Sequence, residues 1–103
     1  MIEPLEVQFT DLAARHVRDA ERWWRINRPA APNAIREELQ RLLPLIAVQP
    51  RMGSRAMNVK LQGVRRIHIP RIRYHLYFHV TGSPEFVEVV AFWHSSRGSG
   101  PPI

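Results

Sequence analysis

Basic and imidazole side chains recur in the second half of the sequence, at alternate positions that share one face of a β-strand. Arg66 and His68 lie two residues apart in one alternating run, and Arg97 follows the last run. The polar positions of the middle run are His75, Tyr77 and His79. Guanidinium and imidazole groups gathered on one face would bind phosphates or an acidic protein segment. The alternative is an exposed sheet face whose long side chains only prevent edge-to-edge aggregation.

The same residues do not indicate a metal site or a familiar catalytic motif. His75 and His79 are four strand positions apart, about 13 Å, which is too far to share a metal ion. His68 can approach either of them from the neighbouring strand, but a histidine pair without carboxylate or thiol support is more often structural. Neither Glu85 nor Glu88 has a carboxylate partner for acid–base catalysis. The sequence has no cysteine, phosphate-binding glycine loop or zinc spacing, so we expect no metal and no cofactor.

The composition predicts one soluble domain with an anionic partner. The chain has 103 residues, a formal net charge of +6, and arginine at all but one of its 15 basic positions. A charge of this size attracts nucleic acid or an acidic protein, although high arginine content can also reflect the nucleotide composition of the gene. No segment approaches the ~20 apolar residues of a membrane span, and the amino end does not resemble a secretory signal. We therefore expect a cytoplasmic protein that does not bind membranes.

Hydrophobic periodicity predicts the elements that position these side chains. In order, they are a strand at 4–9, a helix at 11–27, a second helix over 35–46, and strands at 64–69, 74–80 and 86–93. This order, β-α-α-β-β-β, predicts an α+β fold of two layers, with an antiparallel helical hairpin on a small antiparallel sheet. The last strand is apolar on both faces except at Glu88, so we expect it in the sheet interior. A short edge strand is expected near 58–61, and 97–103 is expected to be a flexible tail.

With these elements laid out, residues 5 to 100 resemble the RelE/ParE superfamily of toxins from type II toxin–antitoxin systems, and most closely its ParE branch. The resemblance rests on four segments in order: EVQFTDLAARHVRDAERWWRINRP, LLPLIAVQPRMG, VRRIHIPRIRYHLYF and VVAFWHSSRGSGP. RelE-like members are ribosome-dependent messenger RNA endonucleases. That branch would imply catalytic roles for Arg66, His68, His75 and Arg97. However, His75 stands where RelE-like chains usually carry arginine, and no aromatic residue follows Trp93.

The ParE branch implies a different activity, inhibition of DNA gyrase by protein contact, without a nuclease site. For this leading hypothesis the expected target-binding residues, near one end of the sheet, are Arg65, Arg66, His94 and Arg97. The resemblance also implies a cognate antitoxin, whose acidic segment would wrap the toxin and form a hetero-oligomer with it. The expected antitoxin anchors are Trp23, Trp24 and Tyr77. A third alternative is an inactive relative that binds antitoxin only.

Overall fold

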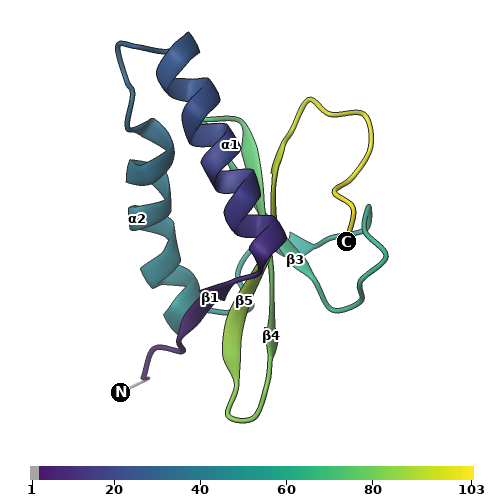
Figure 1. Ribbon diagram of the computed structural model, residues 1–103. Helices are drawn as coiled ribbons and strands as arrows, with labels where there is room; N and C mark the ends of the chain where they lie inside the picture. The colour runs from purple at the N-terminus through teal and green to yellow at the C-terminus, as the bar shows by residue number, and fades with distance from the viewer. Residues whose placement is uncertain (1–2) are drawn as a thin grey trace.

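The computed structural model describes residues 3–103, in which two helices cover one face of a five-stranded sheet (Figure 1). The elements are β1 (Val7–Phe9), α1 (Asp11–Asn27), α2 (Ala34–Val48), β2 (Ser54–Arg55), β3 (Arg65–Ile69), β4 (Tyr74–Thr81) and β5 (Phe86–His94). The predicted α+β fold and element order are confirmed. The prediction of a short edge strand near 58–61 is wrong, because the edge strand is β2, whose two residues pair with β3. Neither helix is long and apolar enough to cross a membrane within the described residues.

The strands are ordered β1-β5-β4-β3-β2 in one sheet. The interior position predicted for β5 is confirmed, since it lies between β1 and β4. All pairs are antiparallel except β1 with β5, where Val7 lies opposite Val87 in a parallel register. The sheet is therefore mixed, and its one parallel pair was not expected. The three residues of β1 carry no pattern that fixes the direction of the strand. In the sequence, both helices separate β1 from the other strands of the sheet.

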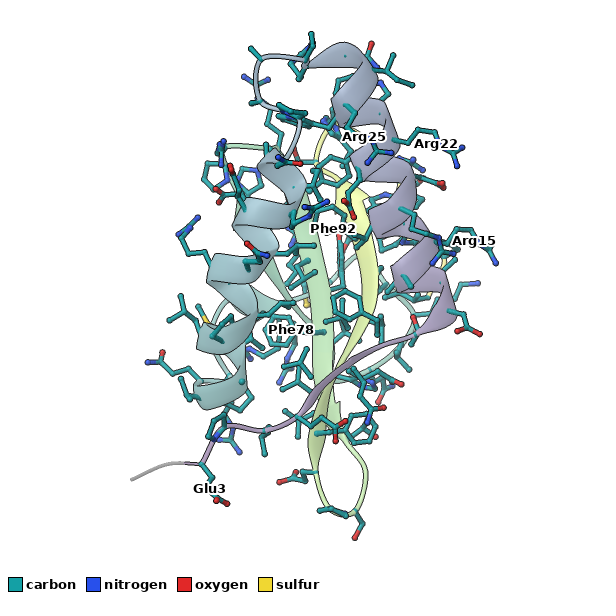
Figure 2. All side chains as sticks on the ribbon, turned by 60° about the vertical axis from the view of Figure 1, so that its left-hand side comes forward. Glu3, Arg15, Arg22, Arg25, Phe78 and Phe92 are labelled. Atoms are coloured by element: carbon teal, nitrogen blue, oxygen red, sulfur yellow. The ribbon has the colours of Figure 1, made fainter. Side chains whose placement is uncertain are left out.

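The helical hairpin forms because each helix has an apolar stripe and a defined start. Thr10 accepts a hydrogen bond from the backbone N–H of Ala13 (3.1 Å), which caps α1. The main core lies between the helices and the sheet, and Phe78 and Phe92 fill its centre (Figure 2). Arg15, like other arginines of α1, is exposed on the outer side of the helix (Figure 2). Because the apolar stripe of α1 packs against the core, the basic residues on the opposite side of the helix lie in solvent.

The far face of the sheet, opposite the helices, carries a second and smaller core. Tyr77 and Val90 of the sheet are buried there against Val64, at the end of the loop at 56–64. This loop and the end of the chain lie on the side of the sheet opposite the helices (Figure 1). The expectation that Tyr77 lies on an open face is therefore wrong, since it is 1% exposed. Its hydroxyl accepts a hydrogen bond from the Asn58 side chain (3.0 Å), which holds the loop in place. The alternation of residues along β4 predicted the correct face for Tyr77, the one opposite the helices. It could not predict that a loop would cover the side chain there.

The segment 97–103 folds back along this loop. Trp93 Nε1 donates a hydrogen bond to the Ser99 carbonyl oxygen (2.8 Å), and the Lys60 backbone N–H donates one to that of Ile103 (2.9 Å). Pro101 is buried. These contacts place the segment against the domain, and its flexibility stays a prediction.

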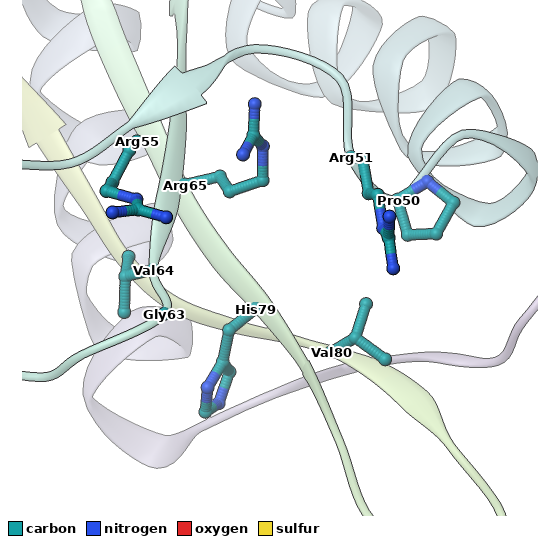
Figure 3. A pocket seen from close by; sticks show the side chains of 8 residues that line it. All are labelled: Pro50, Arg51, Arg55, Gly63, Val64, Arg65, His79 and Val80. Atoms are coloured by element: carbon teal, nitrogen blue, oxygen red, sulfur yellow. The ribbon is translucent and has the colours of Figure 1, made fainter.

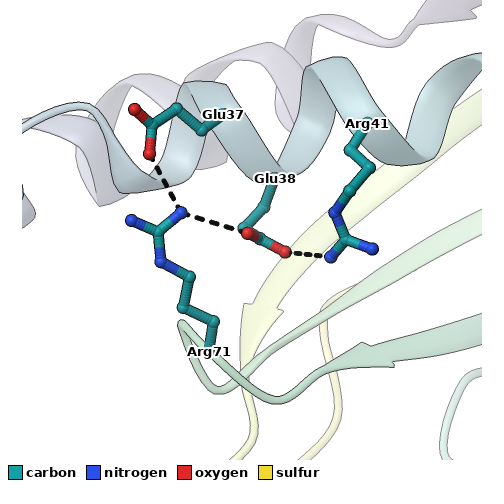
Figure 4. Close-up of polar contacts among 4 residues, drawn as sticks. All are labelled: Glu37, Glu38, Arg41 and Arg71. Carbon is teal, nitrogen blue, oxygen red and sulfur yellow. Dashed lines mark hydrogen bonds and ion pairs between the residues drawn. The ribbon is translucent and has the colours of Figure 1, made fainter.

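An ion-pair network joins α2 to the turn between β3 and β4 (Figure 4). Arg71 bonds Glu37 (2.9 Å) and Glu38 (3.1 Å), and Arg41 also bonds Glu38. Burial alone would raise the pKa of Glu38, but hydrogen bonds from Arg41 and Arg71 outweigh it and hold that pKa below its ordinary value. Two arginines of this basic protein are thus neutralised within the fold.

Candidate functional site

A row of rings crosses the far face beyond the second core, from β3 to β5. Cross-strand register places His68 opposite His75, and His75 opposite Trp93. The two imidazole ring centroids are 4.8 Å apart. The Arg97 guanidinium lies over the Trp93 ring, 3.9 Å from its centroid, as a cation–π contact. The structure thus brings together residues that are far apart in the sequence.

Arg66 lies one row further along the same face, opposite Tyr77. Burial lowers the pKa of His75, and the positive charges of Arg66 and His68 lower it further. The neutral imidazole is therefore favoured at this position. Four residues therefore lie on the same part of the far face: Arg66, His68, His75 and Arg97. They are the residues to which the RelE-like hypothesis assigns catalytic roles.

The contact between the two imidazoles limits what this row can do chemically. In-line displacement at a phosphate requires groups on opposite sides of the phosphorus, each within about 2.6–3.2 Å of the atom that it serves. His68 and His75 instead pack ring against ring at 4.8 Å, which leaves no room for a phosphate between them. In this arrangement the pair can bind an anion from one side. It cannot act as an acid and base that flank one phosphate.

His94 faces the helix side at the same end of β5. Its Nδ1 accepts a hydrogen bond from the Ser96 backbone N–H (3.1 Å), so Nε2 is left to donate. A pocket of about 300 Å³ opens beside it, with Trp23, Tyr74 and Arg97 among its lining residues. His94 and Arg97 therefore lie together at the end of the sheet, as expected.

Arg65 lies elsewhere, although it was expected in the same group. Strand register puts it four β4 positions from the level of His94, about 13 Å along the strand. Its guanidinium donates hydrogen bonds to the backbone carbonyls of Met52 (3.1 Å) and Gly53 (2.8 Å). The expectation that Arg65 lies beside His94 is wrong, because Arg65 begins β3 at the other end of the sheet and the strand reaches the level of His94 only at Ile69. A target-binding role for any of these residues stays a prediction.

Arg65 instead forms part of a second basic site, which we call the arginine groove. Its charged and imidazole lining consists of Arg51, Arg55, Arg65 and His79 around a volume of about 360 Å³ (Figure 3). His79 Nε2 lies 2.8 Å from a carboxylate oxygen of Glu88. Sequence reasoning did not identify this site. The arginines at 51 and 55 were visible, but only the pairing of β2 with β3 brings them next to Arg65.

The tryptophans expected to anchor an antitoxin lie near the carboxyl end of α1, at the opposite end of the sheet from the arginine groove. Trp23 is 45% exposed, whereas Trp24 packs against the main core. Their rings meet edge to face at 5.9 Å, and the Arg28 guanidinium lies 5.3 Å from the Trp23 ring centroid. Trp24 Nε1 is buried without a hydrogen-bond partner among the described residues. Trp23 is thus the tryptophan available to a partner.

Within residues 3–103 no group of three or more histidine and acidic side chains is arranged to hold a metal ion. The possible sites are therefore built from arginine, histidine and aromatic groups.

Comparison with known proteins identifies the family. The family model described as the ParE toxin of the type II toxin–antitoxin system parDE matches residues 7–98. A structure titled "Chromosomal ParDE TA system from P. aeruginosa" is similar with a TM-score of 0.69 and 17% identity, over 87% of this chain and 95% of that one. The RelBE2 toxin–antitoxin complex from Mycobacterium tuberculosis has a TM-score of 0.64 and 16% identity, over 94% and 97%. No curated protein matches the sequence. The two solved structures show a shared fold, and the family match spans most of the sequence, so the chain belongs to the family of ParE toxins of type II toxin–antitoxin systems.

Proposed function

We propose that this protein inhibits DNA gyrase by protein contact and is neutralised by a cognate antitoxin. The observation that carries the proposal is the family match over residues 7–98, because a ParE-type toxin is expected to act on gyrase. The histidine row adds support, since rings in contact do not flank a phosphate as a nuclease would need. The contact surface would be the end of the sheet, where His94 and Arg97 lie together, with Arg66 about 10 Å away on the far face.

A gyrase assay with purified protein tests this proposal. We expect loss of supercoiling activity and accumulation of cleaved DNA linked to gyrase, together with growth arrest on transient expression. The variant His94→Ala with Arg97→Ala should relieve the inhibition. Arg36→Ala, an exposed change on α2, should leave it intact. Normal supercoiling in the presence of excess toxin would exclude gyrase as the target.

A second candidate function is messenger RNA cleavage on the ribosome. The observation that favours it is the shared far face of Arg66, His68, His75 and Arg97, where guanidinium groups could stabilise charge at a phosphate. Cleavage sites mapped on translated messages would reveal this activity, and Arg66→Ala should abolish them. Intact messages in arrested cells would rule it out.

The antitoxin belongs to the same proposal. Both solved relatives come from toxin–antitoxin systems by their titles, and the +6 charge of this chain would attract an acidic segment. Trp23→Ala should weaken antitoxin binding by about 2 kcal/mol or more if the exposed indole is an anchor. Ile26→Ala, on the same helix and 72% exposed, is the matched control. Antitoxin binding without gyrase inhibition or growth arrest would indicate an inactive relative.

A further inference from the structure

The arginine groove gathers three guanidinium groups and one imidazole from four separate segments of the chain. Arg51 comes from the loop after α2, Arg55 from β2, Arg65 from β3 and His79 from β4 (Figure 3). No carboxylate is among the described residues that line it. Like charges that line one groove repel one another, and an anion bound between them lowers that repulsion.

The groove differs in this respect from the other arginine cluster of the fold. Arg41 and Arg71 are paired with the two carboxylates of Glu37 and Glu38, whereas Arg51 and Arg55 are exposed and bond no described acidic residue. Arg65 bonds only backbone carbonyls, which fix its position but leave its charge uncompensated. The carboxylate of Glu88, next to the groove, is paired with His79. The uncompensated charge thus lies at the β2–β3 edge of the sheet, open to solvent.

We propose that the arginine groove binds phosphodiester groups of a nucleic-acid backbone without sequence preference. A guanidinium presents a planar fork of donors that matches two phosphate oxygens, and arginine is preferred over lysine at such sites. No tryptophan, tyrosine or phenylalanine is among the described residues that line the groove, so it offers no large platform for stacked bases. The apolar side chains among the described residues of its lining are Pro50, Val64 and Val80, and the exposed tryptophan that could anchor a protein segment lies at the opposite end of the sheet.

This inference goes beyond gyrase inhibition and does not depend on it. Because the contact is to phosphates alone, we expect duplex DNA, with its higher charge density, to bind at least as tightly as single strands. DNA binding that persists in a protein without effect on gyrase would refute the proposed function and leave this inference standing.

Fluorescence anisotropy with short labelled duplexes of two unrelated sequences, and with single-stranded DNA and RNA, tests the groove between about 50 and 200 mM salt. Arg51→Ala with Arg55→Ala should weaken binding to every probe. It should also reduce the slope of log K against log salt by about two for duplex DNA, because two phosphate contacts are lost. Both side chains are exposed, and an unchanged thermal melt will confirm that the variant folds.

Arg15→Ala with Arg22→Ala removes the same charge from the outer side of α1 and is the matched control (Figure 2). It should leave the salt slope nearly unchanged. Equal losses in the two double variants would overturn the proposal, because net charge would then explain the binding. So would a loss confined to one DNA sequence, or displacement of duplex by polyglutamate at equal concentration, which would assign the groove to carboxylates.

Discussion

The pKa of His75 responds to the charges near it in the row of rings on the far face. Burial lowers its pKa from the ordinary 6.5, and Arg66 and His68 add to the effect. The unfolded chain therefore takes up this proton more readily than the folded protein does. The stability contributed by the neutral imidazole is present above about pH 6.5 and declines as the pH falls below that value.

Removal of the neighbouring charge should move this titration. We expect Arg66→Gln to raise the pKa of His75, because one of the positive charges that oppose protonation is gone. Titration of the imidazole resonances by NMR will measure the shift, with Arg36→Gln as a control of equal charge far from the row. An unmoved His75 titration would show that Arg66 does not influence the site.

Single residues also show the limits of prediction from sequence. The approach of His68 to His75 followed from alternation and a short hairpin, and the structure confirms it. The burial of Tyr77 and the displacement of Arg65 from His94 could not be predicted. The burial of Tyr77 depends on the path of the loop at 56–64, whose sequence has no periodicity. The position of Arg65 depends on the register of β3 against β4.

Among the elements, the carboxyl-terminal segment depends on close packing at one glycine. A methyl group at Gly100 would lie 2.0 Å from the Asn58 carbonyl oxygen, whereas one at Gly98 would meet nothing within 4 Å. We therefore expect Gly100→Ala to displace the segment from the loop and Gly98→Ala to leave it in place. Amide relaxation of residues 97–103 measured by NMR will distinguish them. Equal mobility in the two variants would mean that this contact does not hold the segment.

The elements differ in how well their sequence predicts them. The interior position of β5 was predictable because a strand apolar on both faces has no solvated side. The pairing of β1 with β5 was not, since three residues encode neither direction nor partner. The edge strand β2 consists of two exposed residues, and their pairing depends on the neighbouring strand.

At the scale of the whole molecule, stability depends mainly on the core between helices and sheet. Phe78 is fully buried at its centre, so Phe78→Ala should lower the free energy of unfolding by about 3–5 kcal/mol. Met57→Ala, at a side chain that is 83% exposed, should change it by no more than about 0.5 kcal/mol. Urea denaturation will measure both values. A small effect at Phe78 would mean that the helices contribute little to the stability of the sheet.

The parallel pair of β1 and β5 has a consequence for the newly made protein. Val7 lies opposite Val87, eighty positions later in the chain, so the first strand has no partner until nearly the whole polypeptide has been synthesised. At about 5–20 residues per second, that delay lasts about 4–16 s. Until β5 has been made, the apolar stripes of α1 and α2 have no complete sheet to cover them. The core between the helices and the sheet can therefore be completed only after β5 has been synthesised.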